Sequence, residues 1–280
     1  MYKKDNFIKT LAEIKNYIFA YQFNKFPFLL DFKSNPYTYL KARYYMYCSV
    51  YLVFFLLRTR ITPNIVTIIY VLAGIATGIL LAIPNIYCNL VAVFIAFNKG
   101  ILDWSDGNLA RIKYKPSITG HILDEYGATI NSIGLIIGLG FYSMQQSGFT
   151  FLTYVIPIVP FLHGEKFMSI GKVILFNNLK SSSLAINNKK SSNNKDRDQQ
   201  STKQLQYPSK LIRLSNILDD RARSVDFILL IVLLDLYFKT HATVYLFILI
   251  SIKLLIQFIL SFYYGVKNKW AESLIDKINE

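Results

Sequence analysis

Three aspartates lie close together in the stretch LDWSDGNLARIKYKPSITGHILDEYGA, which runs from Leu102 to Ala128. Asp103 and Asp106 are three residues apart, so a helix would place both carboxylates on neighbouring positions of one face. Asp124 follows near the start of the next predicted helix, and the short link from Ile112 to Thr119 lets the two helix ends approach one another. We therefore expect the three carboxylates to converge.

The position of these carboxylates favours a cation site. Carboxylates at the edge of the hydrocarbon are costly, and they are usually retained because they bind a cation or line a polar cavity. Ligand sets made only of oxygen suit Mg²⁺, Mn²⁺ or Ca²⁺, and such an ion can bridge phosphate oxygens. The small side chains of Gly107 and Ala110 would let a bulky ligand lie close to the helix. The structural alternative is that the aspartates cap helices or pair with Arg111 and Lys113.

The elements that must position these residues are membrane helices. The chain has 280 residues, of which 53% are hydrophobic and only 17% are charged, which is too apolar for one ordinary soluble core. About 20 apolar residues are needed to cross a bilayer as a helix. Six candidate spans can be placed on the sequence: Thr62–Ile83, Ile86–Arg111, Ile118–Met144, Phe149–Phe176, Ser224–Phe238 and Thr243–Val266. The predicted fold is therefore an all-α integral membrane protein with a bundle of six transmembrane helices.

The distribution of charge predicts how this bundle is oriented. Lys and Arg number 31 against 17 Asp and Glu, and they gather before the first span, at Arg58 and Arg60, and in the links after the second and fourth spans. The links at Pro84–Tyr87 and Gln145–Gly148 carry no charge. Basic segments stay on the cytoplasmic side, so we expect both termini and the acidic cluster to face the cytoplasm. This bias and anionic lipid explain the basic segments, and we expect no nucleic-acid partner.

Regions outside the bundle have their own patterns. Apolar residues recur at helical spacing among lysines near the N-terminus, at Phe7, Ile8, Leu11, Ile14 and Ile18. We expect an interfacial amphipathic helix in a cytoplasmic segment 1–60, followed by a membrane domain at 61–266 and a cytoplasmic tail at 267–280. Within the domain, a loop at about 180–207 is rich in Ser, Asn, Lys and Gln. This loop cannot bury enough apolar surface to order itself, which predicts disorder.

The acidic stretch resembles the signature of the CDP-alcohol phosphotransferase family. That signature reads DxxDGxxAR, then, after a short gap, GxxxDxxxD. Seven of its eight fixed positions match here, namely Asp103, Asp106, Gly107, Ala110, Arg111, Gly120 and Asp124. The segment Ile61–Thr67 (ITPNIVT) is similar to the family's usual start of the first span, where Thr62 can cap the helix and Pro63 fits its first turn.

The resemblance implies a reaction. Family members, also called CDP-alcohol phosphatidyltransferases, transfer a substituted phosphate from a CDP-alcohol, such as CDP-diacylglycerol, to an acceptor hydroxyl and release CMP. A pair of Mg²⁺ or Mn²⁺ ions on the cytoplasmic side supports this chemistry. The expected context is phospholipid or related phosphodiester synthesis. The expected partners are the CDP-alcohol, the acceptor and membrane lipids, with a homodimer as a further expectation.

The resemblance also implies roles for single residues. Asp103, Asp106 and Asp124 would hold metal. The nucleotide site would be lined by Gly107, Ala110, Arg111 and Asn64, and Gly120 would give the substrate access.

Position 128 departs from the signature. The family has an Asp there, proposed as general base and metal neighbour, whereas this chain has Ala128, which can neither take a proton nor bind metal. A second metal ion would then be held less tightly. Three interpretations stay open: a deliberate Asp-to-Ala change in an active enzyme, a natural homologue that binds CDP or lipid or regulates a partner without catalysis, and replacement of the base by Glu125 or His121. A transporter that uses the acidic cluster for ions is a further alternative.

The fourth predicted span contains polar residues of its own. His163, Glu165 and Lys166 interrupt this span. They fit either a polar cavity that receives the acceptor or an internal ion pair.

Overall fold

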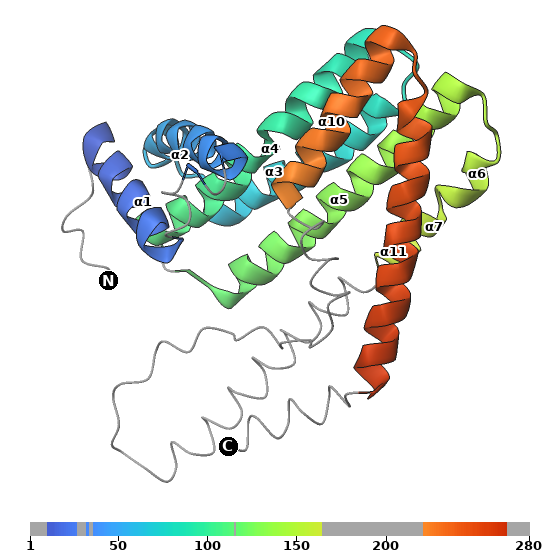
Figure 1. The fold of residues 1–280 in the computed structure, drawn as a ribbon. Helices are drawn as coiled ribbons and strands as arrows, with labels where there is room; N and C mark the ends of the chain where they lie inside the picture. Colours follow the sequence, from blue (N-terminus) through green and yellow to red (C-terminus); the bar gives the residue numbers. More distant parts are fainter. Residues whose placement is uncertain (1–9, 27–31, 34–35, 115, 164–220, 268–280) are drawn as a thin grey trace.

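A computed structural model describes residues 10–26, 32–33, 36–114, 116–163 and 221–267, and every regular element in these ranges is a helix (Figure 1). The helices are α1 (Leu11–Lys25), α2 (Pro36–Leu56), α3 (Pro63–Leu81), α4 (Ile86–Lys113), α5 (Ile118–Ser147), α6 (Leu152–Val155), α7 (Ile158–Leu162), α10 (Arg221–Phe238) and α11 (Ala242–Lys267). The predicted all-helical class is confirmed for this part of the chain.

Local sequence explains where the long helices begin and end. Pro63 occupies the first turn of α3, as predicted, whereas the Thr62 side chain makes no capping hydrogen bond. Asn85 caps α4, because its side-chain oxygen accepts from the backbone N–H groups of Tyr87 and Cys88. Gly148 ends α5 in the left-handed conformation, with φ of 71°. These boundaries agree with the predicted spans to within a few residues.

Four of the described helices, α3, α4, α5 and α11, are long and apolar enough to cross a membrane. They coincide with four of the six predicted spans. The fifth prediction corresponds to α10, which carries the charged residues Arg221, Arg223, Asp226 and Asp235 and is not among these four. The fourth prediction begins as the short helices α6 and α7, and its remainder lies outside the described residues, as do the polar loop and most of the C-terminal tail. The six-span count therefore stays a prediction.

Small residues bring α3 and α5 into direct backbone contact. A Cβ atom built on Gly78 of α3 would lie 2.4 Å from the carbonyl oxygen of Gly134, and one built on Gly138 would lie 2.7 Å from Cα of Gly78. Only glycine allows this approach. Because α3 also packs along α4, the ends of α4 and α5 that carry the signature are held against one common helix.

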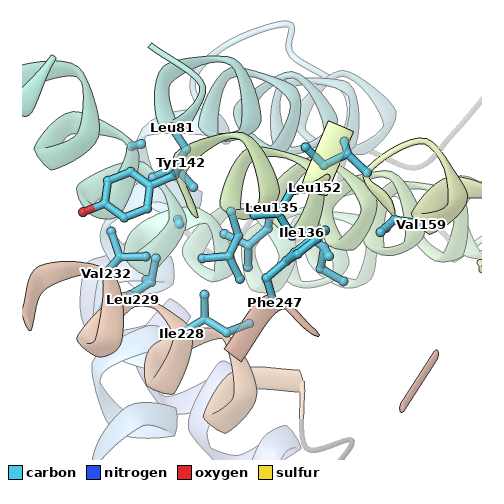
Figure 2. Packing of buried hydrophobic residues seen from close by; sticks show 14 of the residues in the cluster. Leu81, Leu135, Ile136, Tyr142, Leu152, Val159, Ile228, Leu229, Val232 and Phe247 are labelled. Atoms are coloured by element: carbon cyan, nitrogen blue, oxygen red, sulfur yellow. The ribbon is translucent and has the colours of Figure 1, made fainter. Parts of the chain in front are cut away.

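The main core joins the long helices to the C-terminal pair α10 and α11. Figure 2 shows Leu135, Ile136 and Tyr142 of α5 packed near Phe247 of α11 and Val232 of α10. Tyr142, Phe247 and Val232 are completely buried. In Figure 1, α10 lies along α4, and α11 crosses the C-terminal half of α5.

A second core attaches the N-terminal helices at the opposite end of the molecule (Figure 1). Ile14 and Ile18 of α1 are buried against residues of α2, α3 and α4, including Leu109. The predicted N-terminal helix is present from Leu11, but Phe7 and Ile8 lie outside the described residues. Two of its apolar residues therefore face protein, and its location at the membrane interface stays a prediction. Helix α2 was not predicted separately from this segment.

Candidate functional site

Asp106 is the buried centre of the signature helix. Its carboxylate on α4 is only 6% exposed and accepts a hydrogen bond of 2.6 Å from Oγ1 of Thr67 on α3. A carboxylate removed from water needs such donors to remain charged. Thr67 was not singled out from the sequence, although it lies one turn after Pro63 in the matching segment Ile61–Thr67.

Asp124 and Arg111 complete the charges around Asp106. Asp124, half-buried near the start of α5, and Arg111, at the end of α4, both interact electrostatically with the Asp106 carboxylate. Two of the three predicted metal ligands thus lie within electrostatic range of one another. Two carboxylates that approach one another attract a cation, and their oxygen donors fit Mg²⁺ or Mn²⁺.

Asp103 has a different environment. It is half-buried and interacts electrostatically with Lys99, one turn earlier on α4, and with Tyr45 of α2. Three residues turn a helix through about 300°, so the two side chains diverge by roughly 60° around α4. Among the residues that the structure describes, no three His, Cys, Asp or Glu side chains form a group that could hold a metal ion. Convergence of all three aspartates therefore stays a prediction.

Arg111 lies across Gly107 on the surface of α4. Its Nη2 donates a hydrogen bond of 2.7 Å to Oδ1 of Asn108, and Nδ2 of Asn108 donates one of 3.3 Å to Oγ of Ser49 on α2. A Cβ atom at position 107 would lie 3.2 Å from Nη2. The glycine therefore leaves space for the guanidinium, while half-buried Ala110 adds little bulk to the same end of the helix.

The structure places Asn64 and Gly120 next to each other. A Cβ atom built on Gly120 would lie 3.7 Å from Oδ1 of Asn64, which is exposed at the start of α3. The backbone N–H of Gly120 donates to Oγ of Ser117, the residue that caps α5. These two predicted site residues thus share the rim where α3 and α5 begin, close in sequence to Thr67 and Asp124.

Ala128 is half-buried one turn after Asp124 on α5. The two predicted substitutes, His121 and Glu125, lie within two turns of it on the same helix, and their role as a base stays a prediction. His121 is exposed, and Glu125 is half-buried, with its backbone carbonyl accepting a hydrogen bond from Thr129.

A serine–histidine pair lies one further turn along α5. Oγ of Ser132 is 3.2 Å from Nε2 of His163, which is 1% exposed, and Nδ1 of His163 is 3.0 Å from the carbonyl oxygen of Val159. The sequence singled out His163 but not Ser132. Ser132 follows Ala128 by four residues, and this spacing could have placed it on the same face of the helix as the signature position. The predicted partners Glu165 and Lys166 lie outside the described residues.

Comparison with known proteins identifies the domain that carries this site. The family model described as CDP-alcohol phosphatidyltransferase matches residues 60–186, which include α3 to α7 and every signature residue. Helices α1, α2, α10 and α11 lie outside the matched segment. No curated protein matches the chain. Residues 60–186 of this chain thus match the CDP-alcohol phosphatidyltransferase domain.

Proposed function

We propose that this protein transfers a substituted phosphate group from a CDP-alcohol to the hydroxyl group of an acceptor and releases CMP. The observation that carries the proposal is the buried Asp106, held by Thr67 and within electrostatic range of Asp124 and Arg111, in the matched domain. The family acts on a CDP-alcohol and an alcohol acceptor in a membrane, and the four apolar helices fit this setting. Phosphatidyl transfer in phospholipid synthesis is the most direct form of this activity.

The chain's own residues prepare a site for an anionic nucleotide. Thr67 fixes the orientation of the Asp106 carboxylate, and Asn108 fixes the Arg111 guanidinium next to Gly107. A guanidinium is suited to phosphate, because it offers several donors in one plane. Asp106 and Asp124, with Asp103 as a third ligand, would hold Mg²⁺ or Mn²⁺. Such ions, when bound, neutralise the charge of the pyrophosphate and of the leaving CMP.

Ala128 favours a second candidate function. A methyl group cannot accept the proton of the acceptor hydroxyl, so a non-catalytic membrane protein that binds CDP or lipid fits the same scaffold. In this case the metal-dependent affinity for CDP is kept, while release of CMP is absent. We also propose that both termini and the site face the cytoplasm, and that two copies of the chain form a dimer.

The test is metal-dependent release of CMP from a panel of CDP-alcohols with mixed acceptors. The protein with its own sequence is compared with Ala128→Asp, and Asp106→Asn serves as the control for background hydrolysis. Turnover only in Ala128→Asp identifies an enzyme scaffold that lacks its base. Turnover in both proteins means that another group accepts the proton. Binding of CDP without turnover in either protein supports the non-catalytic function, and absence of both contradicts the family reaction for this chain.

A further inference from the structure

Helix α1 lies outside the matched domain but contacts its signature. The side chain of Tyr21, near the end of α1, is half-buried, and its ring centroid is 4.3 Å from Cζ of Arg111. This distance is well within the range of a cation–π interaction, about 6 Å. The helix is held at this place because Ile14 and Ile18 are buried in the second core together with Leu109, two residues before Arg111.

The Arg111 guanidinium is thus fixed by two different helices. Asn108, on α4 itself, accepts a hydrogen bond from Nη2, and Asn108 is completely buried and tied to Ser49 of α2. Tyr21 contributes the aromatic face. Nε of Arg111 is buried and makes no hydrogen bond within the described residues.

Lys25 is the other cation near this ring. Its Nζ lies 5.8 Å from the Tyr21 centroid, at the limit of the interaction, and its side chain is exposed. Arg111 is closer and less exposed, and a guanidinium stacks on aromatic faces more readily than an ammonium group. The ring therefore interacts mainly with Arg111.

We infer that Tyr21 is a positioning residue, which holds the Arg111 guanidinium next to Gly107 in the orientation that binds the phosphates of the nucleotide. This inference rests on the proposed function for the identity of the ligand. An arginine side chain has several rotatable bonds, and ordering it during binding costs free energy. A ring that orders it beforehand raises the affinity for an anion without touching the anion. The N-terminal helix would then be a functional part of the site.

The test is the dissociation constant of CDP in the presence of Mg²⁺, measured by titration of the full chain in nanodiscs. Tyr21→Leu removes the aromatic ring, Tyr21→Phe keeps it, and Tyr17→Leu is the matched control at an exposed position of α1. The expected loss of affinity in Tyr21→Leu is about two- to fivefold, corresponding to the usual strength of an exposed cation–π pair. Tyr21→Phe and Tyr17→Leu are expected to bind like the original protein.

A structural role is separated from positioning by a double-mutant cycle with Arg111→Gln. When the guanidinium is absent, Tyr21→Leu is expected to have no further effect on the affinity. An unchanged dissociation constant in Tyr21→Leu, or the same loss in both backgrounds, overturns the inference.

If the original protein does not bind CDP, the proposed function fails. The interaction between Tyr21 and Arg111 is then tested by measuring the midpoint of thermal unfolding of the same single and double variants. Coupling between Tyr21 and Arg111 supports the fixed guanidinium, and additive effects reject it.

Discussion

The hydroxyl group of Thr67 donates a hydrogen bond to the carboxylate of Asp106, and this bond joins α3 to the signature helix α4 at its most buried acidic residue. Thr67 is itself 3% exposed, so water does not replace the bond if the hydroxyl is removed. The contact also links two parts of the matched domain, the beginning of the span α3 and the acidic motif on α4. The function of Asp106 therefore depends on a residue 39 positions earlier in the chain.

Replacing Thr67 by Val is expected to lower stability and impair the site. The change keeps the shape but removes the hydroxyl donor from the Asp106 carboxylate, and a hydrogen bond to a charged group is worth about 1.5–3 kcal/mol. Thr67→Ser is expected to restore most of the loss. The measurements are the midpoint of thermal unfolding and Mg²⁺-dependent CDP binding. Thr77→Val is the control on the same helix, because the buried Thr77 hydroxyl bonds only to the carbonyl of Ala73 among the described contacts. Equal effects of the two Val variants would contradict a specific role for Thr67.

The aspartates are expected to contribute unequally to metal binding. Asp106→Asn and Asp124→Asn each remove one of two carboxylates that interact electrostatically, so each is expected to weaken Mg²⁺-dependent CDP binding by at least about tenfold. Asp103→Asn is expected to have a smaller effect, because Asp103 interacts with Lys99 and Tyr45. The measurement is a Mg²⁺ titration at fixed CDP, and EDTA should abolish the metal-dependent part. An equal loss in all three variants would instead support the convergence predicted from the sequence.

Gly78→Ala is expected to destabilise the contact between α3 and α5. The new methyl group would overlap the carbonyl oxygen of Gly134, and two helix backbones must separate to admit it. Overpacking of this kind costs about 1–3 kcal/mol or more. Gly148→Ala is the comparison, since a Cβ atom there meets nothing within 4 Å and only the positive φ of 71° is unfavourable. Thermal unfolding should rank Gly78→Ala as the more damaging change, and the reverse order would show that the helices separate easily.

The ion pair between Lys41 of α2 and Asp226 of α10 is expected to make stability depend on pH. The two groups are 2.7 Å apart and mostly buried, and Tyr37 also donates to Asp226. Asp226→Asn leaves a buried cation without its counter-ion, which costs about 3–5 kcal/mol at neutral pH. Burial lowers the pKa of Lys41 from 10.5, while the hydrogen bond and the charge of Asp226 oppose the shift.

The sign of the pH effect follows from the protons bound in each state. Between the lowered pKa of Lys41 and 10.5, the unfolded chain binds more protons than the folded chain, so the contribution of Lys41 to stability rises with pH. Asp226→Asn removes the hydrogen bond and the charge that raise the pKa of Lys41 in the folded protein. The window therefore extends to lower pH, while its upper end stays at 10.5. The difference in unfolding free energy between Asp226→Asn and the original protein should therefore shrink as the pH approaches 10.5. A difference that is constant from neutral to alkaline pH would show that Lys41 stays charged in both proteins.

Helix positions could be predicted from the sequence to within a few residues, because α3, α4, α5 and α11 are set by apolar length, by Pro63 and by Gly148, all of which act locally. The sequence also predicted the match to the CDP-alcohol phosphatidyltransferase domain, because the spacing of the signature from Asp103 to Asp124 is itself a linear pattern. Spacing along a helix did not decide which side chains meet. Asp103 and Asp106 are close in sequence, but Asp106 accepts from Thr67 of α3, whereas Asp103 interacts electrostatically with Lys99 of α4.

Only the tertiary structure decided the partners of the signature residues. Thr67 meets Asp106 because α3 packs along α4, while glycine backbones hold the other side of α3 close to α5. Tyr21 reaches Arg111 because the apolar residues of α1 are buried against α2 and α4. Both contacts depend on which helices share a buried face, and this property belongs to the packing of the whole chain and not to any segment of it.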